Sequence, residues 1–172
     1  MATYKEIKGV TVQTRDSDPE LNVGSWASGG SLNTGRRQIH SAKNGTQTAT
    51  LGFGGYTTTW VANTESYNGT AFTEVNDLNS ARYEHAGSGT QTAALAIGGY
   101  DGSFRAYTES WNGSSWTEVN DLNTARIDSG AGGTQTSSIA AGGAVPPNNA
   151  TNVVETWDGT SWTEVSEINS AR

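Results

Sequence analysis

The sequence predicts an all-β protein built from a repeated unit, and three observations lead to that prediction. An eleven-residue element runs from Gly89 to Gly99 and recurs, slightly altered, from Gly45 and from Gly133, so the period is 44 residues. The 172-residue chain contains 22 glycines and is only 33% hydrophobic, as expected of a protein with many tight turns. No long stretch shows the helical spacing of apolar residues. Self-similarity at this period indicates a repeat architecture.

Each repeat shows the same order of signals. A Gly-Gly doublet closes an apolar run, two aromatic residues follow five positions apart, and an arginine ends the unit. We interpret these recurring positions as structural, because function more often depends on what differs between repeats. They are Gly54, Gly55, Gly98, Gly99, Gly142 and Gly143, the aromatics Trp111, Trp116, Trp157 and Trp162 with Tyr67 and Phe72 in the first repeat, and the arginines Arg82, Arg126 and Arg172, with Arg36 in a partial copy.

This order of glycines, aromatics and arginine resembles the kelch repeat over residues 24–172. The resemblance implies a β-propeller whose blades each have four antiparallel strands. The turn sequences, Gly-Thr-Gln-Thr and Asn-Gly-Thr/Ser, are also similar to those of kelch-type repeats in virion-associated tail fibre or adhesion proteins of marine bacteriophages. That second resemblance implies a location in the virion. Without it, the absence of a recognisable signal peptide favours a soluble protein.

The repeat divides the chain into consecutive parts. Residues 1–23 do not fit the repeat and are expected to form an N-terminal extension or linker. Residues 24–36, around Trp26, read as an orphan fourth strand. Three full blades are then expected at about 37–79, 80–123 and 124–172.

Strands within a blade are placed by their turns. In the middle repeat we expect a first strand from His85 to Ser88, a turn at Ser88-Gly89 and a second strand from Gln91 to Ile97. A third strand should end at Asn112-Gly113, and the fourth should begin at Trp116. The dipeptide Asn-Gly favours a type I′ hairpin turn, because both central positions of that turn need positive φ.

The repeated arginines and aromatics have two interpretations each. We expect the arginines to bond loop carbonyls or the recurring glutamates of a neighbouring repeat, either Glu65, Glu109 and Glu155 or Glu74, Glu118 and Glu164. A ring of guanidinium groups that binds an anion is the alternative. The aromatics are expected to be buried between blades rather than to form a stacking platform.

Candidate binding residues lie where the repeats stop resembling one another, in residues 56–63, 100–107 and 144–152. Variable connections on a rigid framework are typical sites of recognition. Drift of unselected loops is the structural alternative. The candidates are Tyr56, Trp60, Tyr100, Asp101, Phe104, Arg105, Tyr107, Asn148 and Asn149.

Composition argues against several function classes. A net charge of −7 gives no basic surface for nucleic acid. The chain has no cysteine, and its two histidines, His40 and His85, have no second ligand at a metal-binding spacing. We therefore expect no metal, no cofactor and no catalytic residues. A non-catalytic recognition or structural module is favoured, with a protein or glycan as ligand; a lectin-like propeller is the alternative, and a kelch-fold enzyme is the least favoured.

Three blades are too few to close a propeller, which typically has four to eight. We expect self-association, with a homodimer of three blades per chain as the favoured arrangement. The rival interpretation is that the chain is the N-terminal part of a longer propeller. No apolar stretch is long enough to predict a membrane span.

Overall fold

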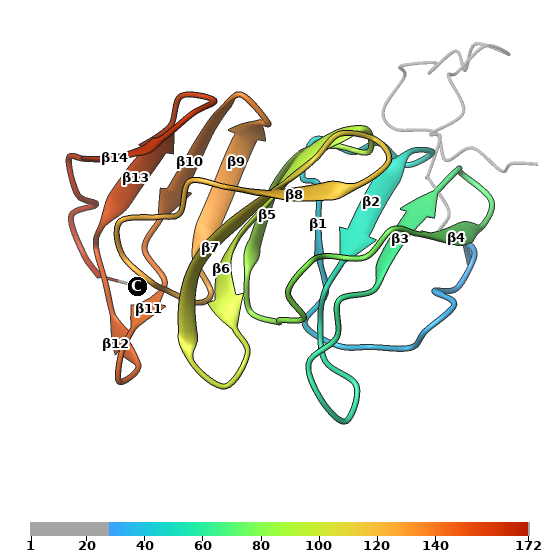
Figure 1. Cartoon of the computed structure of the whole chain (residues 1–172), viewed down its shortest axis with the longest axis horizontal. Helices are drawn as coiled ribbons and strands as arrows, with labels where there is room; N and C mark the ends of the chain where they lie inside the picture. The colour runs from blue at the N-terminus through green and yellow to red at the C-terminus, as the bar shows by residue number, and fades with distance from the viewer. Residues whose placement is uncertain (1–27, 172) are drawn as a thin grey trace, which may run out of the picture.

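The computed structural model describes residues 28–171, which form β-strands and the connections between them (Figure 1). Three antiparallel sheets of four strands contain most of the strand residues in this region, and the strand order in each sheet follows the chain. Sheet 1 contains β1 (His40–Ser41), β2 (Thr50–Phe53), β3 (Thr64–Tyr67) and β4 (Phe72–Val75); sheet 2 contains β5 (Ala86–Thr90), β6 (Ala93–Tyr100), β7 (Phe104–Trp111) and β8 (Trp116–Val119); sheet 3 contains β9 (Gly130–Thr134), β10 (Ser137–Ala141), β13 (Val154–Trp157) and β14 (Trp162–Val165). A short hairpin, β11 (Ala144–Val145) with β12 (Asn149–Ala150), lies between β10 and β13. The predicted all-β class, with four antiparallel strands in each repeat, is confirmed.

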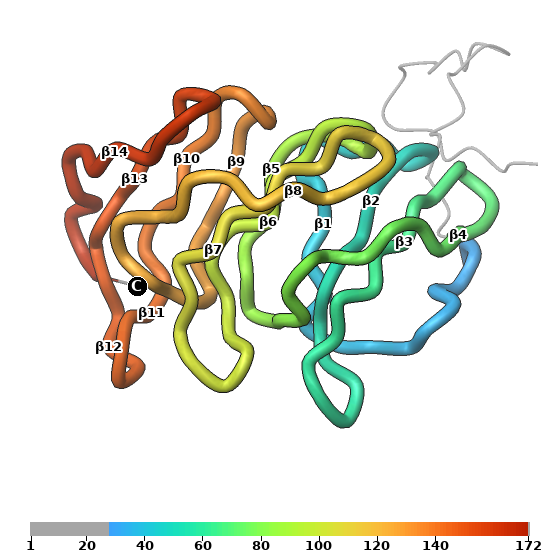
Figure 2. The backbone as a smooth tube through the Cα atoms, viewed as in Figure 1, coloured from blue at the N-terminus to red at the C-terminus, as the bar shows by residue number. Residues whose placement is uncertain are grey.

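The three sheets stand next to one another in chain order, and their first strands meet on the inside of the array (Figures 1 and 2). Asn44 shows how close these strands come. Its amide N–H donates to the carbonyl of Gly89 in sheet 2 at 2.8 Å, and its side-chain nitrogen donates to the carbonyl of Gly133 in sheet 3 at 2.9 Å. The sheets of residues 28–171 are thus fixed relative to one another but do not close into a ring.

The turn between the first two strands lies further along the chain than predicted. β5 continues to Thr90 and β6 starts at Ala93, so the chain reverses at Gln91 and Thr92 rather than at Ser88-Gly89. Gly89 adopts positive φ (87°) within the strand instead of forming the turn. The reason lies in Gln91, whose side-chain nitrogen donates to the carbonyl of Tyr67 in sheet 1 at 2.6 Å. Placing this glutamine at the tip of the hairpin lets it reach the preceding sheet.

Hairpins at the Asn-Gly positions are present, but the predicted type I′ turn is wrong. β3 and β4 are joined by the four residues 68–71, and of these only Gly69 has positive φ. The side-chain oxygen of Asn68 instead accepts hydrogen bonds from the amides of Thr70 and Ala71, at 2.9 and 3.0 Å. An Asx side chain that satisfies the turn amides in this way favours a longer loop. Asn112 and Asp158 make the same pair of bonds.

Each Gly-Gly doublet brings two backbones into close contact. Gly98 and Gly99 have φ of 66° and 114°, and the pairing of β6 with β7 shifts register at this point. The amide of Gly99 donates to the carbonyl of Arg126 at 2.9 Å, while a Cβ on Gly98 would lie 2.6 Å from that oxygen. Only glycine provides both the positive φ and the space.

The hydrophobic core consists of two clusters, one between sheets 1 and 2 and one between sheets 2 and 3. Trp116 packs against Phe53 of sheet 1 with ring centroids 4.9 Å apart, and its indole N–H donates to Thr64 Oγ1 at 3.0 Å. Trp162 donates in the same way to Thr108 at 3.0 Å. The four repeated tryptophans are buried, as expected. Tyr67 and Phe72, at the equivalent positions of sheet 1, are only half-buried, because no sheet in the described region covers that side.

Some predicted features lie outside the described residues. These are the extension at residues 1–23, the start of the orphan strand with Trp26, and Arg172. Residues 28–36 are described, contain no strand, and run along the side of sheet 1 that points away from sheet 2.

Candidate functional site

One edge of the molecule carries the connections between second and third strands. These connections, including the β11–β12 hairpin, extend along the lower edge in Figures 1 and 2, and we call this edge the loop face. The segments that lead into the first strands lie beside them, since single antiparallel bridges join Arg37 to Tyr56, Tyr83 to Tyr100 and Ile127 to Ala144. The two kinds of connection therefore share one face.

Four aromatic side chains form a continuous row on the loop face. Tyr56 and Tyr83 have ring centroids 5.3 Å apart, Tyr83 and Tyr100 are 5.7 Å apart, and Tyr100 and Phe104 are 5.8 Å apart. Each contact is edge-to-face, the geometry that aromatic pairs prefer. All four side chains are half-buried, so the row keeps part of its surface exposed. We call these residues the aromatic row.

The backbone holds the aromatic row in place. Tyr100 and Tyr83 exchange two backbone hydrogen bonds, of 2.8 and 3.1 Å, and Tyr56 exchanges bonds of 2.9 and 3.0 Å with Arg37. The guanidinium of Arg37 lies 4.6 Å from the centroid of the Tyr56 ring, within cation–π range. In sheet 3 the equivalent bridge joins Ile127 to Ala144, so the row ends at sheet 2.

Three of the predicted binding residues, Tyr56, Tyr100 and Phe104, therefore belong to one row. The fourth member, Tyr83, was not predicted, because it directly follows the recurring Arg82 and reads as framework. A signal does exist in the sequence. The position after the arginine is Arg37, Tyr83 and Ile127 in the three repeats, so it varies while its neighbour does not.

Trp60 lies in the connection between β2 and β3, where it forms a bridge with Tyr56, and 38% of its surface is exposed. Its ring approaches the next connection, since a Cβ added to Gly102 would lie 3.5 Å from it. Trp60 thus extends the aromatic surface toward sheet 2 and is the most accessible large ring on the loop face.

The remaining predicted residues have mixed surroundings. Arg105 donates from Nε to Asp101 at 2.7 Å and lies 5.1 Å from the Tyr107 ring centroid, so its charge is already paired. Asn148 and Asn149 are exposed at the β11–β12 hairpin. That hairpin belongs to sheet 3, where the aromatic row has no member.

Two carboxylates lie next to the row in strained backbone. Gln38, Glu84 and Asp128 occupy equivalent positions and have φ of 52°, 54° and 53°. Gln38 donates to Glu84 at 2.7 Å, and the amide of Asp128 donates to the Glu84 carbonyl at 2.8 Å. Burial, and then the charge of Asp128, raise the pKa of Glu84; burial also raises the pKa of Asp128. Positive φ in residues other than glycine is uncommon and clusters at functional sites.

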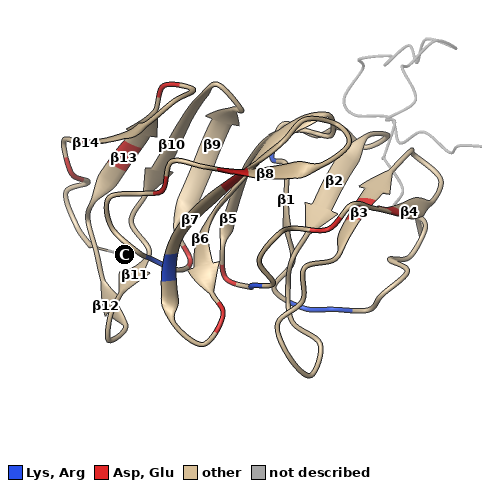
Figure 3. Cartoon of the chain, in the orientation of Figure 1, with Lys and Arg blue, Asp and Glu red and all other residues tan. Residues whose placement is uncertain are grey.

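The repeated arginines are not part of an open anion site. Arg36 pairs with Glu65, Arg82 with Glu109 and Arg126 with Glu155, and both members of each pair are buried. The expected pairing of arginine with a glutamate of the next repeat is therefore observed. The few basic positions in Figure 3 lie mostly along the loop face.

An asparagine also bonds to the glutamate of each pair. We call the resulting group of one asparagine, one arginine and one glutamate the glutamate clamp. The amide of Asn79 donates to Glu109 Oε2 at 2.7 Å and its side chain donates to the same oxygen at 2.8 Å. Asn33 and Asn123 make equivalent bonds to Glu65 and Glu155. Burial raises the pKa of Glu65, but the bonds from Asn33 and the pairing with Arg36 outweigh it and hold the pKa below its ordinary value.

The two histidines lie together inside the molecule. The rings of His40 and His85 have centroids 4.9 Å apart, and neither nitrogen of the buried His85 ring has a hydrogen-bond partner among residues 28–171. Burial, and then the charge of Lys43, lower the pKa of His40 to about 4, and burial holds that of His85 well below its ordinary value. Across residues 28–171 no group of three or more His, Cys, Asp or Glu side chains is placed to hold a metal ion.

Comparison with known proteins gives no family for the chain. No family model matches it, and no curated protein matches it in sequence. Within the part of the chain that the structure describes, no helix is long and apolar enough to cross a membrane.

Proposed function

We propose that the chain is a non-catalytic recognition module that binds a protein or a glycan through its loop face. The observation that carries this proposal is the aromatic row, which joins two connections that differ between repeats. Aromatic side chains supply contact area at low cost in conformational entropy, as in other recognition surfaces. The resemblance to kelch-type phage repeats favours a virion appendage or host-adhesion component as the setting.

The same proposal includes the wider architecture. The three sheets are kelch-type blades, and the propeller is completed by self-association rather than within one chain. Two observations support this arrangement. The first strands of the three sheets lie side by side, and large aromatic side chains pack between neighbouring sheets. The glutamate clamp repeats at each described joint, as a blade array requires.

A lectin-like propeller is the second candidate, and Trp60 is the observation that favours it. A ring that is 38% exposed, on a face that also carries tyrosines and carboxylates, resembles the combination of flat apolar surface and hydrogen-bond acceptors that sugars need. An enzymatic function is the least favoured candidate, because no observation on the described part of the loop face points to a catalytic reaction.

Binding to a glycan array and to a panel of marine bacterial cells tests the proposal. We expect Trp60→Ala and Tyr100→Ala to weaken binding at least about tenfold, the loss typical of a central aromatic contact. Thr117→Ala, on exposed β8 away from the loop face, is the matched control and should bind normally. Unchanged binding by both aromatic variants would refute the assignment of the loop face. Binding to isolated glycans would select the lectin-like candidate, and binding to cells alone would favour a protein ligand.

A further inference from the structure

The joint between sheets 1 and 2 has two distinct halves. Sheet 1 contributes aliphatic and aromatic side chains from its second strand, Leu51 and Phe53, both fully buried. Sheet 2 receives them on a side that carries small residues and the paired rings of Trp111 and Trp116. We call the first kind of side the outgoing face and the second kind the incoming face.

The joint between sheets 2 and 3 repeats this arrangement. Leu95 and Ile97 now form the outgoing face, and Trp157 and Trp162 lie on the incoming face of sheet 3. One interface is thus made twice in the molecule, with large apolar side chains of the second strand and paired tryptophans at equivalent positions.

The outgoing face of sheet 3 is uncovered in the described region. Ile139 aligns with Leu51 and Leu95, yet it is 44% exposed, whereas both leucines are completely buried. Val165, on the fourth strand of the same sheet, is 41% exposed. Within residues 28–171, Ile139 and Val165 are the most exposed of the large aliphatic side chains.

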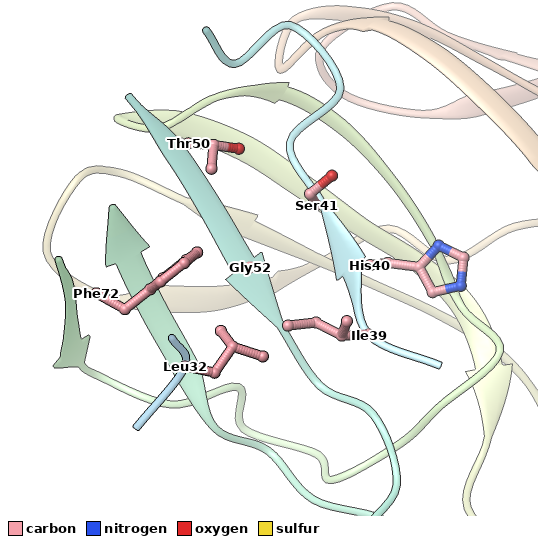
Figure 4. A pocket seen from close by; sticks show the side chains of 7 residues that line it. All are labelled: Leu32, Ile39, His40, Ser41, Thr50, Gly52 and Phe72. Atoms are coloured by element: carbon pink, nitrogen blue, oxygen red, sulfur yellow. The ribbon is translucent and has the colours of Figure 1, made fainter. Parts of the chain in front are cut away.

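The incoming face of sheet 1 contains a pocket of about 230 Å³ (Figure 4). Phe72, at the position of Trp116, lines it together with Leu32, Ile39 and Gly52. Figure 4 shows the apolar side chains around the pocket, while the ring of His40 extends away from it. A sheet that packed here would occupy the place that sheet 1 holds on sheet 2.

Part of this incoming face is already covered by the chain itself. Leu32 aligns with Leu78, and Asn33 and Arg36 form the glutamate clamp with Glu65. These residues take the place of the segment that follows the fourth strand of a preceding sheet. The open pocket therefore corresponds to the place that the outgoing face of a preceding sheet would fill. The place of the segment after that sheet's fourth strand is already occupied by this chain.

We propose that the outgoing face of sheet 3 binds the incoming face of sheet 1 of a second copy. Ile139 and Val165 of one copy fill the pocket beside Phe72 of the other, which continues the interface seen twice within the chain. In this joint, residues 166–171 of the first copy cannot pack as residues 76–82 do within the chain. Leu32, Asn33 and Arg36 of the second copy already occupy that position, so residues 166–171 are displaced. Two copies joined reciprocally supply six sheets, within the range of known propellers.

This inference rests on the blade architecture of the proposed function but not on ligand binding at the loop face. The mass of the full chain in solution, measured by sedimentation velocity over a concentration series, tests it. We expect a dimer at roughly 50 µM that dissociates on dilution, as mass action requires. Ile139→Asp on the outgoing face and Ser41→Arg in the pocket should each raise the dissociation constant at least about tenfold. Ser103→Asp, exposed in the β6–β7 connection, should leave it unchanged.

Mixing the two disrupted variants gives the sharpest result. Each variant retains one intact face, so an equimolar mixture can form one of the two joints and should associate more strongly than either variant alone. Loss of association in Ile139→Asp without any effect of Ser41→Arg would show that two sheet 3 faces pair, which overturns the proposal. A wild-type monomer across the series would also overturn it.

Two further variants guard against ambiguous results. Val165→Asp is a second outgoing-face change, and circular dichroism of every variant verifies that an altered mass does not reflect unfolding. Removal of residues 166–172 should preserve or strengthen the dimer. Loss of the dimer in that truncated chain would contradict the displacement of this segment and with it the proposed geometry.

Discussion

At the scale of single residues, burial separates two kinds of aromatic side chain. Trp116 is 5% exposed and donates a buried hydrogen bond, whereas Trp60 is 38% exposed in the β2–β3 connection. We expect Trp116→Ala to lower the free energy of unfolding by about 3 to 5 kcal/mol, through lost burial and a residual cavity. Trp60→Ala should lower it by less than about 1 kcal/mol. Equal shifts of the two variants in urea-induced unfolding would show that this division is wrong.

The histidine pair makes stability depend on pH. Because the pKa of His40 is about 4 and that of His85 is also depressed in the folded state, the unfolded chain binds more protons below its own histidine pKa of about 6.5. The free energy of unfolding should therefore be highest above neutral pH and fall between about pH 6.5 and 4. His85→Leu should flatten this dependence when unfolding is followed at several pH values. An equally steep slope in that variant would exclude the pair as its cause.

At the scale of an element, the glutamate clamp fastens the end of one repeat to the third strand of the next. Arg82→Met leaves the carboxylate of Glu109 buried without its cation and should cost about 3 to 5 kcal/mol. The double variant Arg82→Met with Glu109→Gln should be less destabilised than the sum of the single changes, because no charge remains unpaired. Arg105→Met is the control, since its ion pair with Asp101 is partly exposed and should contribute at most about 1 kcal/mol. Additive losses in the double-mutant cycle would argue against coupling.

The strands and the ion pairs can be predicted from the sequence more completely than the turns. Repetition of the Gly-Gly doublet and of the aromatic pair predicts three four-stranded units and the pairing of arginine with glutamate. The turns were harder to place, because Asn-Gly supports both a tight turn and the longer Asx-stabilised loop found at Asn68. The position of Gln91 at a hairpin tip depends on a contact with the preceding sheet, which local propensity does not encode.

At the scale of the whole molecule, long-range packing decides what repetition alone does not. The aromatic row requires Tyr83 and Tyr100 to meet from different connections, and only the bridge between them shows this. Likewise, Phe72 aligns with Trp116 in the sequence but is half-buried, because its sheet stands at one side of the array. Equivalent positions have equal burial only where a neighbour is present on both sides.

The repeated interface leads to a prediction about removal of one unit. Deletion of residues 83–126, one period, joins Arg82 to Ile127 and places Asn79 and Arg82 opposite Glu155, in the positions of Asn123 and Arg126. We expect this shortened chain to fold cooperatively, with lower stability because one joint is lost. A deletion of 83–116, which breaks the period, should abolish folding. Comparison of the two thermal transitions by circular dichroism tests the difference, and equal behaviour of the two chains would disprove it.

The glutamate clamp also has an evolutionary consequence. Its two halves lie in different repeats, yet every repeat carries both, so any copy can adjoin any other without a compensating substitution. An in-frame duplication or loss of one whole unit by recombination within the gene then creates no mismatched joint. Lineages with more or fewer repeats would be separated by single genetic events, and selection could act on array length while the variable connections diverge independently.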